Sequence, residues 1–349
     1  MSAIPPVGTS DVRPAHRFDE AALEPYLAER LHGFCGPLAV RQFEGGQSNP
    51  TFHVAAASGA YVLRKKPPGR LLPSAHMIER EYRVMQALGG TGVPVPPVLF
   101  LCADERVIGT PFFLMGYVPG RIFRQPWLPD VPAAGRRAIY AEMVDVLARL
   151  HAVDYGAIGL GDFGKPGNYY ARQIARWSGQ YRAAKTGEVP AMDRLMAWLP
   201  ANIPAGEETS LVHGDYRLEN LIFHPTEPRI LAVVDWELST LGHPLGDLAY
   251  SCLPYHLEPD LLGLLSPAAD TAGIPDESAQ VAAYCRRTGR TGVPHWTFYV
   301  AFSLFRLASI LQGVYARGLQ GNASSTRALE RGAAARRMAE RGWAVAHGD

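Results

Sequence analysis

Short runs of apolar residues bounded by glycine and proline dominate the first third of the chain. Residues 51–56 and 61–65 are strand-like, and the Ser58-Gly59 pair between them predicts a β-hairpin. Runs at 38–43, 98–101 and 111–118 predict three further strands. The run at 111–118 is almost wholly apolar, which is typical of a strand in the centre of a sheet.

Apolar residues at helical spacing appear once in this third and then prevail in the rest of the chain. Met77, Tyr82, Met85 and Leu88 predict a helix over residues 74–88. After a proline-rich break at 120–132, the apolar face formed by Ile139, Met143, Val146, Leu147 and Leu150 predicts a long helix. Further helices are expected at 169–184, at 191–199 and over most of the chain from Leu245, and short strands at 211–212, 221–223 and 230–234.

This order of elements, a strand-rich part followed by a helix-rich part, predicts a two-lobed α+β fold. Residues 19–118 would form an N-terminal lobe with a small antiparallel sheet and one main helix. Residues 119–349 would form a larger, mostly helical C-terminal lobe, and residues 1–18 a flexible tail rich in Pro, Gly and Ser. A length of 349 residues and an apolar content of 47% suit two buried cores.

Charge and cysteine content restrict the partners and the compartment. The net charge of +1 gives no general attraction to nucleic acid or to an anionic membrane, so neither is expected as a partner. The apolar stretch at 296–315 carries Arg306 and Gln312 near its middle, which favours a buried helix of a soluble protein. Four scattered cysteines and the lack of a signal-peptide pattern in residues 1–17 favour the cytoplasm.

The most informative stretch is His213-Gly214-Asp215-Tyr216-Arg217-Leu218-Glu219-Asn220. Asp215 and Asn220 are separated by four residues, the spacing of a kinase catalytic loop, in which the aspartate faces a hydroxyl and the asparagine reaches a magnesium ion. The chain then reverses at 225–228 and returns to Asp235. Because a hairpin brings its ends together, Asn220 and Asp235 are predicted to lie side by side as ligands of one hard cation, Mg²⁺. Asp215 is the predicted catalytic base.

These residues resemble the aminoglycoside phosphotransferase and choline kinase superfamily, and most closely the kinase-like domain that in animals is fused to acyl-CoA dehydrogenases. The resemblance covers about residues 30–320 and rests on the segments at 45–51, 61–69, 79–82, 213–220 and 305–308. It implies a protein-kinase-like fold and an ATP- and Mg²⁺-dependent transfer of the γ-phosphate to a substrate hydroxyl. It also implies that His213 packs beneath the catalytic loop and that Asp247 braces this loop through backbone hydrogen bonds.

A glycine turn between the first two strands is a candidate phosphate-binding segment. Its backbone would be exposed at Gly46, and Ser48 and Asn49 would supply side-chain donors. An ordinary hairpin turn has the same composition, and that alternative stays open.

The strand at 61–65 supplies the expected cation of the nucleotide site. Arg64 stands where the kinase V-A-I-K pattern has its lysine. Strand alternation puts Val62, Arg64 and Lys66 on one face, where they would border the nucleotide, and Lys65 on the other. Arg64 is therefore the expected phosphate contact, Lys66 is the alternative, and Glu81 is the expected ion-pair partner of Arg64.

The end of the strand at 111–118 matches the hinge of the resembling fold. The resemblance implies that the backbone of Gly116 and Val118 binds adenine. The sequence leaves open whether ATP or GTP is preferred, and it leaves the oligomeric state open.

The phosphate acceptor is expected to be a small molecule with a hydroxyl group. Asp235 and Asp247 are separated by only eleven residues, too few for the activation segment of a protein kinase, and no A-P-E motif is present. The resemblance implies a hydroxyacyl-CoA or another hydroxylated acid. An aminoglycoside is less expected, because residues 251–349 contain no acidic cluster.

Two other functions remain possible from the sequence. His213, Asp215, Asp235 and His243 could ligate the metal of a metal-dependent hydrolase, and the chain could be an inactive nucleotide-binding protein. For Arg306, an ion pair within the protein is weighed against a contact with an anionic substrate.

Overall fold

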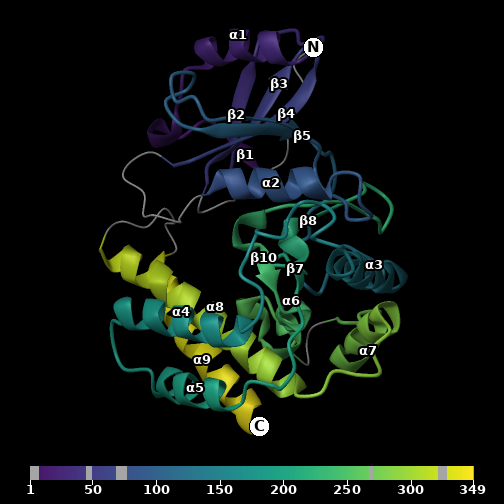
Figure 1. Ribbon diagram of the computed structural model, residues 1–349, viewed down its shortest axis with the longest axis vertical. Helices are drawn as coiled ribbons and strands as arrows, with labels where there is room; N and C mark the ends of the chain where they lie inside the picture. The colour runs from purple at the N-terminus through teal and green to yellow at the C-terminus, as the bar shows by residue number, and fades with distance from the viewer. Residues whose placement is uncertain (1–7, 45–48, 68–76, 267–269, 321–327, 349) are drawn as a thin grey trace. The chain divides into compact units, whose positions relative to one another are not determined.

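The structure, a computed structural model, describes residues 8–44, 49–67, 77–266, 270–320 and 328–348 (Figure 1). The chain divides into two compact units. The first comprises residues 1–119 together with 231–237, and the second comprises residues 120–230 together with 238–349. The sequence places a boundary after residue 118 and does not foresee the return of 231–237, which carries Asp235 and Glu237 into the first unit.

The first unit is built on one antiparallel sheet of six strands, in the order β1-β2-β3-β4-β6-β5. The strands are β1 (Thr9–Ser10), β2 (Ala39–Phe43), β3 (Thr51–Ala56), β4 (Gly59–Lys65), β5 (Val98–Cys102) and β6 (Phe112–Gly116), and the helices are α1 (Glu20–Arg30) and α2 (Ile78–Leu88). Ala56 lies opposite Gly59 in the β3–β4 register, which confirms the predicted hairpin. The predicted helix over 74–88 is described from Ile78 onward, and residues 74–76 lie outside the described residues.

Alternation along β4 directs side chains to opposite faces of this sheet. Leu63 is fully buried in an apolar cluster with Leu27 of α1. Full burial of one such leucine stabilises the fold by about 1.5–3 kcal/mol. Arg64, the next residue, contacts Glu81 of α2. The two helices therefore cover opposite faces of the sheet (Figure 1), and Arg64 lies on the α2 face.

Residues 8–18 belong to the folded first unit, so the predicted flexible tail is wrong for this part. Thr9 in β1 pairs with Phe43 in β2, and the Arg13 N–H donates to Gln42 Oε1 at 3.1 Å. The Phe18 ring meets a ring of β3 edge to face, with centroids 5.1 Å apart. The polar composition of this segment does not indicate a strand, because the two-residue edge strand β1 is stabilised by its pairing with β2. Residues 1–7 lie outside the described residues.

The second unit is mostly helical. Its helices are α3 (Ala133–His151), α4 (Tyr169–Ala183), α5 (Pro190–Ala201), α6 (Pro244–Ser251), α7 (Glu277–Thr288), α8 (Trp296–Leu319) and α9 (Arg331–His347). Its short strands are β7 (Ser210–Val212), β8 (Leu221–Phe223) and β10 (Thr240–Gly242), and β9 (Ile230–Val233) begins in it. Short 3-10 helices lie at Pro14–His16, Leu218–Asn220, Trp236–Leu238, Leu253–His256, Pro259–Leu261 and Ala328–Glu330.

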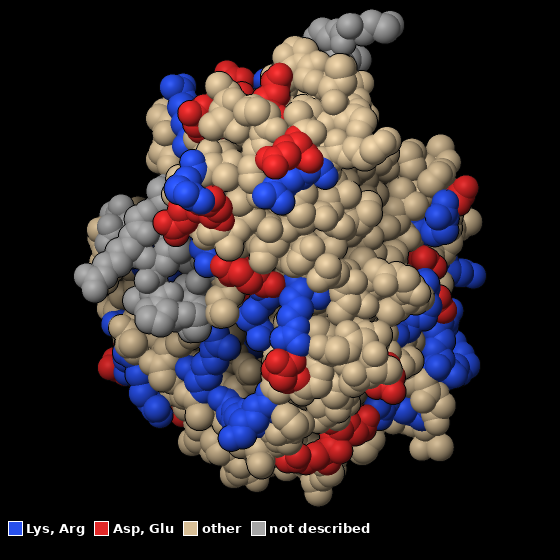
Figure 2. All heavy atoms as spheres, turned by 45° about the horizontal axis from the view of Figure 1, so that its top comes forward, with Lys and Arg blue, Asp and Glu red and all other residues tan. Residues whose placement is uncertain are grey.

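Helix α8 forms the centre of this unit and packs against α4, α6 and α9. Within the described part of the chain it is the one helix long and apolar enough to cross a membrane, and 72% of its apolar window is buried. The core helix of a globular unit passes the same test of length and composition. The surface in Figure 2 carries both signs of charge, in line with the net charge of +1.

Strand β10 pairs antiparallel with β7, with Leu241 opposite Leu211. The sequence does not predict β10, because three residues are too few to show a period of two. The pairing fixes the end of β7, after which the catalytic loop begins.

Candidate active site

Arg64 is the centre of a buried ion cluster in the first unit. Its side chain lies near the end of β4, with Nε 2.8 Å from Glu81 Oε2 and Nη2 2.7 Å from Asp235 Oδ1. Nη2 also lies 3.7 Å from Glu237 Oε2, and Nη1 donates to Thr51 Oγ1 at 3.1 Å. The structure thus contains the Arg64–Glu81 ion pair that the sequence predicts, and adds two carboxylates from residues 231–237.

Carboxylates outnumber the guanidinium in this cluster. When all three carboxylates are ionised, the cluster carries a net charge of −2, and when Glu81 is protonated it carries −1. Burial raises the pKa of Glu81 to about 7, although Arg64 and Asn49 lower it. Burial opposes the charge of Arg64 as well, but the carboxylates, Glu81 first, hold the pKa of Arg64 above its usual value. The excess negative charge, with the Asp235 side chain 29% exposed, suits a divalent cation.

Asn49 holds Glu81 in place. Its side-chain amide is fully buried and donates to Glu81 Oε1 at 2.8 Å. Asn49 thus has a structural contact through its side chain, and the phosphate contact that the sequence predicts stays a prediction. Gly46 and Ser48 lie outside the described residues, so their role stays a prediction.

The lysines after Arg64 occupy different environments. The Lys65 ammonium lies 5.9 Å from the ring centroids of both Phe18 and Phe52, on the face of α1. Lys66 pairs with Glu79. The contacts confirm the predicted strand register, with Arg64 and Lys65 on opposite faces.

The end of β6 offers backbone groups for a planar base. The Gly116 N–H donates to the Pro97 carbonyl at 2.8 Å, and the Tyr117 N–H donates to the Ala60 carbonyl at 3.2 Å. Among the described residues, the Val118 N–H has no acceptor. Val62 is buried on β4 opposite Met115 of β6. The N–H at Val118 is thus the donor that this segment leaves for a ligand.

The catalytic loop lies in the second unit and begins directly after β7. His213 is fully buried, and its Nδ1 accepts a hydrogen bond from the Asp215 N–H at 3.2 Å, so this histidine holds the loop backbone from beneath. Gly214 has φ +85°, and a Cβ there would meet the Leu238 carbonyl oxygen at 2.6 Å. Only glycine suits this tight approach.

Asn220 and Asp215 face each other across the loop. The Asn220 Nδ2 donates to the Asp215 carbonyl oxygen and to Asp215 Oδ2, each at 2.9 Å. Both amide hydrogens are used in this way, and the Asn220 Oδ1 accepts no hydrogen bond within the described part of the chain. An amide oxygen fixed in this manner is a suitable ligand for a hard cation. The Asp215 side chain is 15% exposed, and Arg217 Nε lies 3.3 Å from its Oδ1.

Asp247 of α6 braces the loop, in agreement with the role that the resemblance implies. Its Oδ2 accepts from the His213 N–H at 2.6 Å, and its Oδ1 accepts from the Gly214 N–H at 2.8 Å. Burial opposes its charge, but hydrogen bonds, that of His151 first, hold the pKa of Asp247 below its usual value. Asp247 is therefore an ionised structural acceptor.

Asp235 follows β9 in the first unit, whereas Asn220 belongs to the second. The predicted convergence of these two side chains on one cation therefore stays a prediction. Asp235 has φ +68°, a left-handed conformation that aspartate tolerates better than most residues do. This conformation lets Asp235 reach Arg64 directly after a buried strand.

Three residues of the loop's surroundings have no signal in the sequence. His151 Nδ1 lies 2.7 Å from the Tyr284 hydroxyl, and His151 Nε2 lies 3.5 Å from Asp247 Oδ2, so α3 and α7 support the brace. Burial and then Asp215 raise the pKa of the Tyr250 hydroxyl, which lies against this carboxylate. The three come from separate helices, and a pattern within one helix does not show which faces meet.

The ligand set of the alternative hydrolase is not assembled. Among residues 8–44, 49–67, 77–266, 270–320 and 328–348, no group of three or more His, Cys, Asp or Glu is arranged to hold a metal by itself. His243 instead caps α6 by accepting from the Leu245 N–H at 3.3 Å. Its ring stacks on Tyr299, with centroids 5.6 Å apart.

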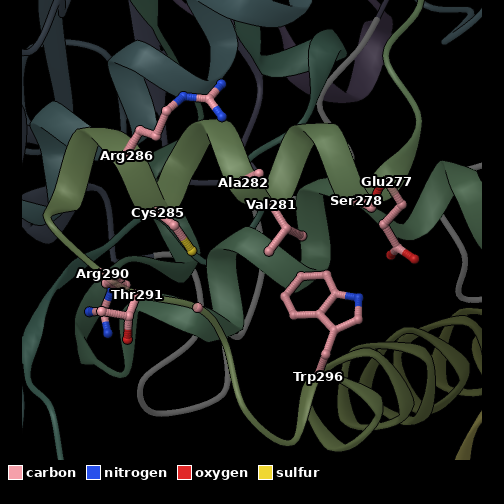
Figure 3. Close-up of a pocket in the computed structure, with 10 residues that line it drawn as sticks. Glu277, Ser278, Val281, Ala282, Cys285, Arg286, Arg290, Thr291 and Trp296 are labelled. Carbon is pink, nitrogen blue, oxygen red and sulfur yellow. The ribbon is translucent and has the colours of Figure 1, made fainter.

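A pocket of about 500 Å³ lies along α7 (Figure 3). Its floor is formed by Val281, Cys285 and Trp296, and the indole ring faces Val281. Two charged residues of its lining have partners, since Arg290 pairs with Glu208 and Glu277 Oε1 lies 2.6 Å from His256 Nε2.

Residues 39–299 match the model of the phosphotransferase enzyme family. The chain is 50% identical over 339 residues to acyl-CoA dehydrogenase family member 10 of Mus musculus, and the alignment covers 96% of this chain and 32% of that protein. It is 46% identical over 346 residues to acyl-CoA dehydrogenase family member 11 of Gallus gallus, covering 96% of this chain and 44% of that protein. The chain thus spans less than half the length of these relatives.

Solved structures agree with this assignment. A crystal structure from Ralstonia eutropha, described as that of a candidate aminoglycoside phosphotransferase, has a TM-score of 0.85 at 52% identity and covers 95% of this chain and 99% of that one. The aminoglycoside phosphotransferase APH(4)-Ia, in a ternary complex with ADP and hygromycin B, has a TM-score of 0.61 at 17% identity, covers 94% of this chain and 100% of that one, and shows the shared fold. The chain belongs to the phosphotransferase enzyme family.

Proposed function

We propose that this chain transfers the γ-phosphoryl group of ATP to a hydroxyl group of a small molecule, with Asp215 as the base. The observation that carries this proposal is the catalytic loop. Asp215 is held from beneath by His213 and Asp247 and from the side by Asn220, while its carboxylate keeps an exposed edge. Such a fixed but accessible carboxylate can orient a hydroxyl and accept its proton.

The nucleotide is assigned to the first unit. Adenine would accept a hydrogen bond from the Val118 N–H and donate to the Gly116 carbonyl, with Val62 against its ring. The fold shared with APH(4)-Ia, whose structure holds ADP, supports this placement. Arg64 would bind phosphate oxygens, and Glu81 would keep its guanidinium in place.

Mg²⁺ is the cation that the donor set suits. Asp235 and the Asn220 Oδ1 would hold it, and the net negative charge around Arg64 would favour it. When bound, this ion neutralises charge on the phosphates and aligns them for transfer.

The proposed phosphoryl transfer forms one bond, breaks one bond and moves one proton. The acceptor oxygen forms a bond to the γ-phosphorus, the bond from this phosphorus to the β–γ bridging oxygen breaks, and ADP leaves with that electron pair. Asp215 orients the hydroxyl and receives its proton late in the step, because the transition state is loose. Arg64 stabilises the charge on the phosphates.

For the acceptor we propose a hydroxyacyl-CoA or another hydroxylated acid. The relatives named as acyl-CoA dehydrogenase family members support this class. Hygromycin B and spectinomycin are bound by structural neighbours at 17% and 11% identity, a level at which only the fold is shared.

The test is a measurement of ADP release from Mg·ATP with a panel of hydroxylated acids, their CoA esters and aminoglycosides. We expect release that depends on one acid class and stops when Mg²⁺ is chelated. A purified chain that shows no thermal shift with Mg·ATP and no ADP release with any acceptor would contradict the proposal.

A further inference from the structure

Arg306, in the middle of α8, is a buried cation without a counter-ion. It is 6% exposed, and it forms no ion pair and donates no hydrogen bond within the described residues. Apart from Asp349, every Asp and Glu of the sequence lies among those residues. The internal ion pair that the sequence favours for Arg306 is therefore absent there.

Two aromatic rings hold the guanidinium. Its central carbon lies 5.6 Å from the ring centroid of Trp177 in α4 and 5.4 Å from that of Tyr250 in α6. These contacts offset part of the cost of burying the charge. The rings do not replace a hydrogen-bond acceptor. The Nε of Arg306 is enclosed and has no acceptor. A guanidinium carries five N–H donors, and the two rings leave this hydrogen-bonding capacity unused.

Tyr250 connects this cation to the catalytic loop. Its hydroxyl lies against Asp215, and its ring lies beside Arg306. A second cation is close, since burial and then the like charge of Arg306 lower the pKa of Arg176. Within the second unit, one tyrosine ring thus lies between the proposed base and a group of arginines.

We propose that Arg306 binds an oxyanion of the phosphate acceptor, so that the substrate is an alcohol that also carries a carboxylate or a phosphate ester. This inference rests on the proposed function and narrows its substrate class. A buried charge without a partner destabilises the free protein, and a bound oxyanion would supply the missing partner. The planar guanidinium can bind either group through two parallel hydrogen bonds. A polycationic acceptor would be repelled.

The experiment is a calorimetric binding titration of the full chain in the presence of Mg²⁺ and AMP-PNP, which prevents turnover. The probes are ω-hydroxycarboxylates of two to eight carbons, the matching carboxamides, and the monophosphates of the matching diols. We expect at least one carboxylate or phosphate to bind about tenfold or more tightly than the amide of the same length. Which of the two anions binds identifies the oxyanion.

Three variants test whether Arg306 causes the preference for the anion over the amide. Arg306→Gln should cancel it, Arg306→Lys should keep part of it, and Arg137→Gln, which removes an exposed charge on α3, should keep all of it. If Arg306→Gln does not fold, the parent and Arg306→Lys decide. Equal binding of anions and amides by the parent, absence of anion binding at millimolar concentration, or discrimination that survives in Arg306→Gln would each overturn the inference. Anion binding through Arg306 without ADP release in the turnover assay would contradict the kinase proposal, and Arg306 would then be an anion-binding residue without a role in phosphate transfer.

Discussion

The side-chain amide of Asn220 donates two hydrogen bonds to Asp215, one to its backbone carbonyl and one to its carboxylate, each 2.9 Å long. One residue therefore fixes the position of the proposed base while its own oxygen is left for a cation. The base and the metal ligand are thus coupled within a single loop, although they would act on different partners, the acceptor and the nucleotide.

Asp215→Asn should separate turnover from nucleotide binding. The amide keeps the size of the side chain and can still accept from Asn220, but it cannot receive a proton. We expect near-parental affinity for Mg·ATP and a loss of kcat of about 10²- to 10⁴-fold. ADP release with an accepted alcohol, together with ATP titration, measures both. Asp130→Asn, an exposed exchange of the same kind, is the control. If the variant keeps most of its turnover, Asp215 is not the base.

Asp235→Asn tests the metal site without a change of backbone. Asparagine tolerates the left-handed conformation that Asp235 adopts, so the fold should persist. The loss of charge should weaken Mg²⁺-dependent binding of ATP by at least about tenfold, because Mg²⁺ prefers carboxylate oxygens. The thermal shift with ATP, measured at several Mg²⁺ concentrations, reports this. Glu79→Gln removes a carboxylate that pairs with Lys66 and should leave the Mg²⁺ dependence unchanged.

Arg64 and Glu81 allow a test that separates the stability of the fold from the binding of ATP. Arg64→Met leaves the buried Glu81 without its partner and should cost about 3–5 kcal/mol of unfolding free energy. Arg64→Met combined with Glu81→Gln removes the unpaired charge, keeps an acceptor for Asn49, and should recover much of the stability. The KM for ATP should stay raised in both, since the phosphate contact is gone in both.

The matching control for this test is Lys66→Met, which removes a cation from the same strand end. It should change the KM for ATP much less than Arg64→Met does. A double variant with normal stability and a parental KM would show that Arg64 serves the fold and not the nucleotide.

The sequence predicts most elements of the fold, though not β1 or β10, and the contents of the catalytic loop, because these depend on local patterns. Alternation along 61–65 suffices to separate Arg64 from Lys65, and the spacing from Asp215 to Asn220 suffices to identify the loop. The hydrogen bond from Asn49 to Glu81 is not foreseen, because the two residues are distant in sequence. The ion pair favoured for Arg306 fails for the same reason, since no local pattern shows that two aromatic rings surround it. Contacts between separate helices depend on packing, which periodicity does not encode.

His243 should make the stability of the chain depend on pH. Burial lowers the pKa of His243 to about 4 from a usual value of 6.5. The unfolded chain therefore takes up a proton as the pH falls below about 6.5, whereas the folded chain resists this until about pH 4. The unfolded state binds more protons in this window, so stability falls as the pH is lowered through it, by up to about 3 kcal/mol.

His243→Asn keeps a side chain that can cap α6 and cannot titrate. Urea unfolding at intervals between pH 4 and 7 should show a smaller slope against pH for the variant than for the parent, whatever the offset from the lost stacking on Tyr299. Parallel profiles for the two proteins would mean that His243 does not carry this dependence.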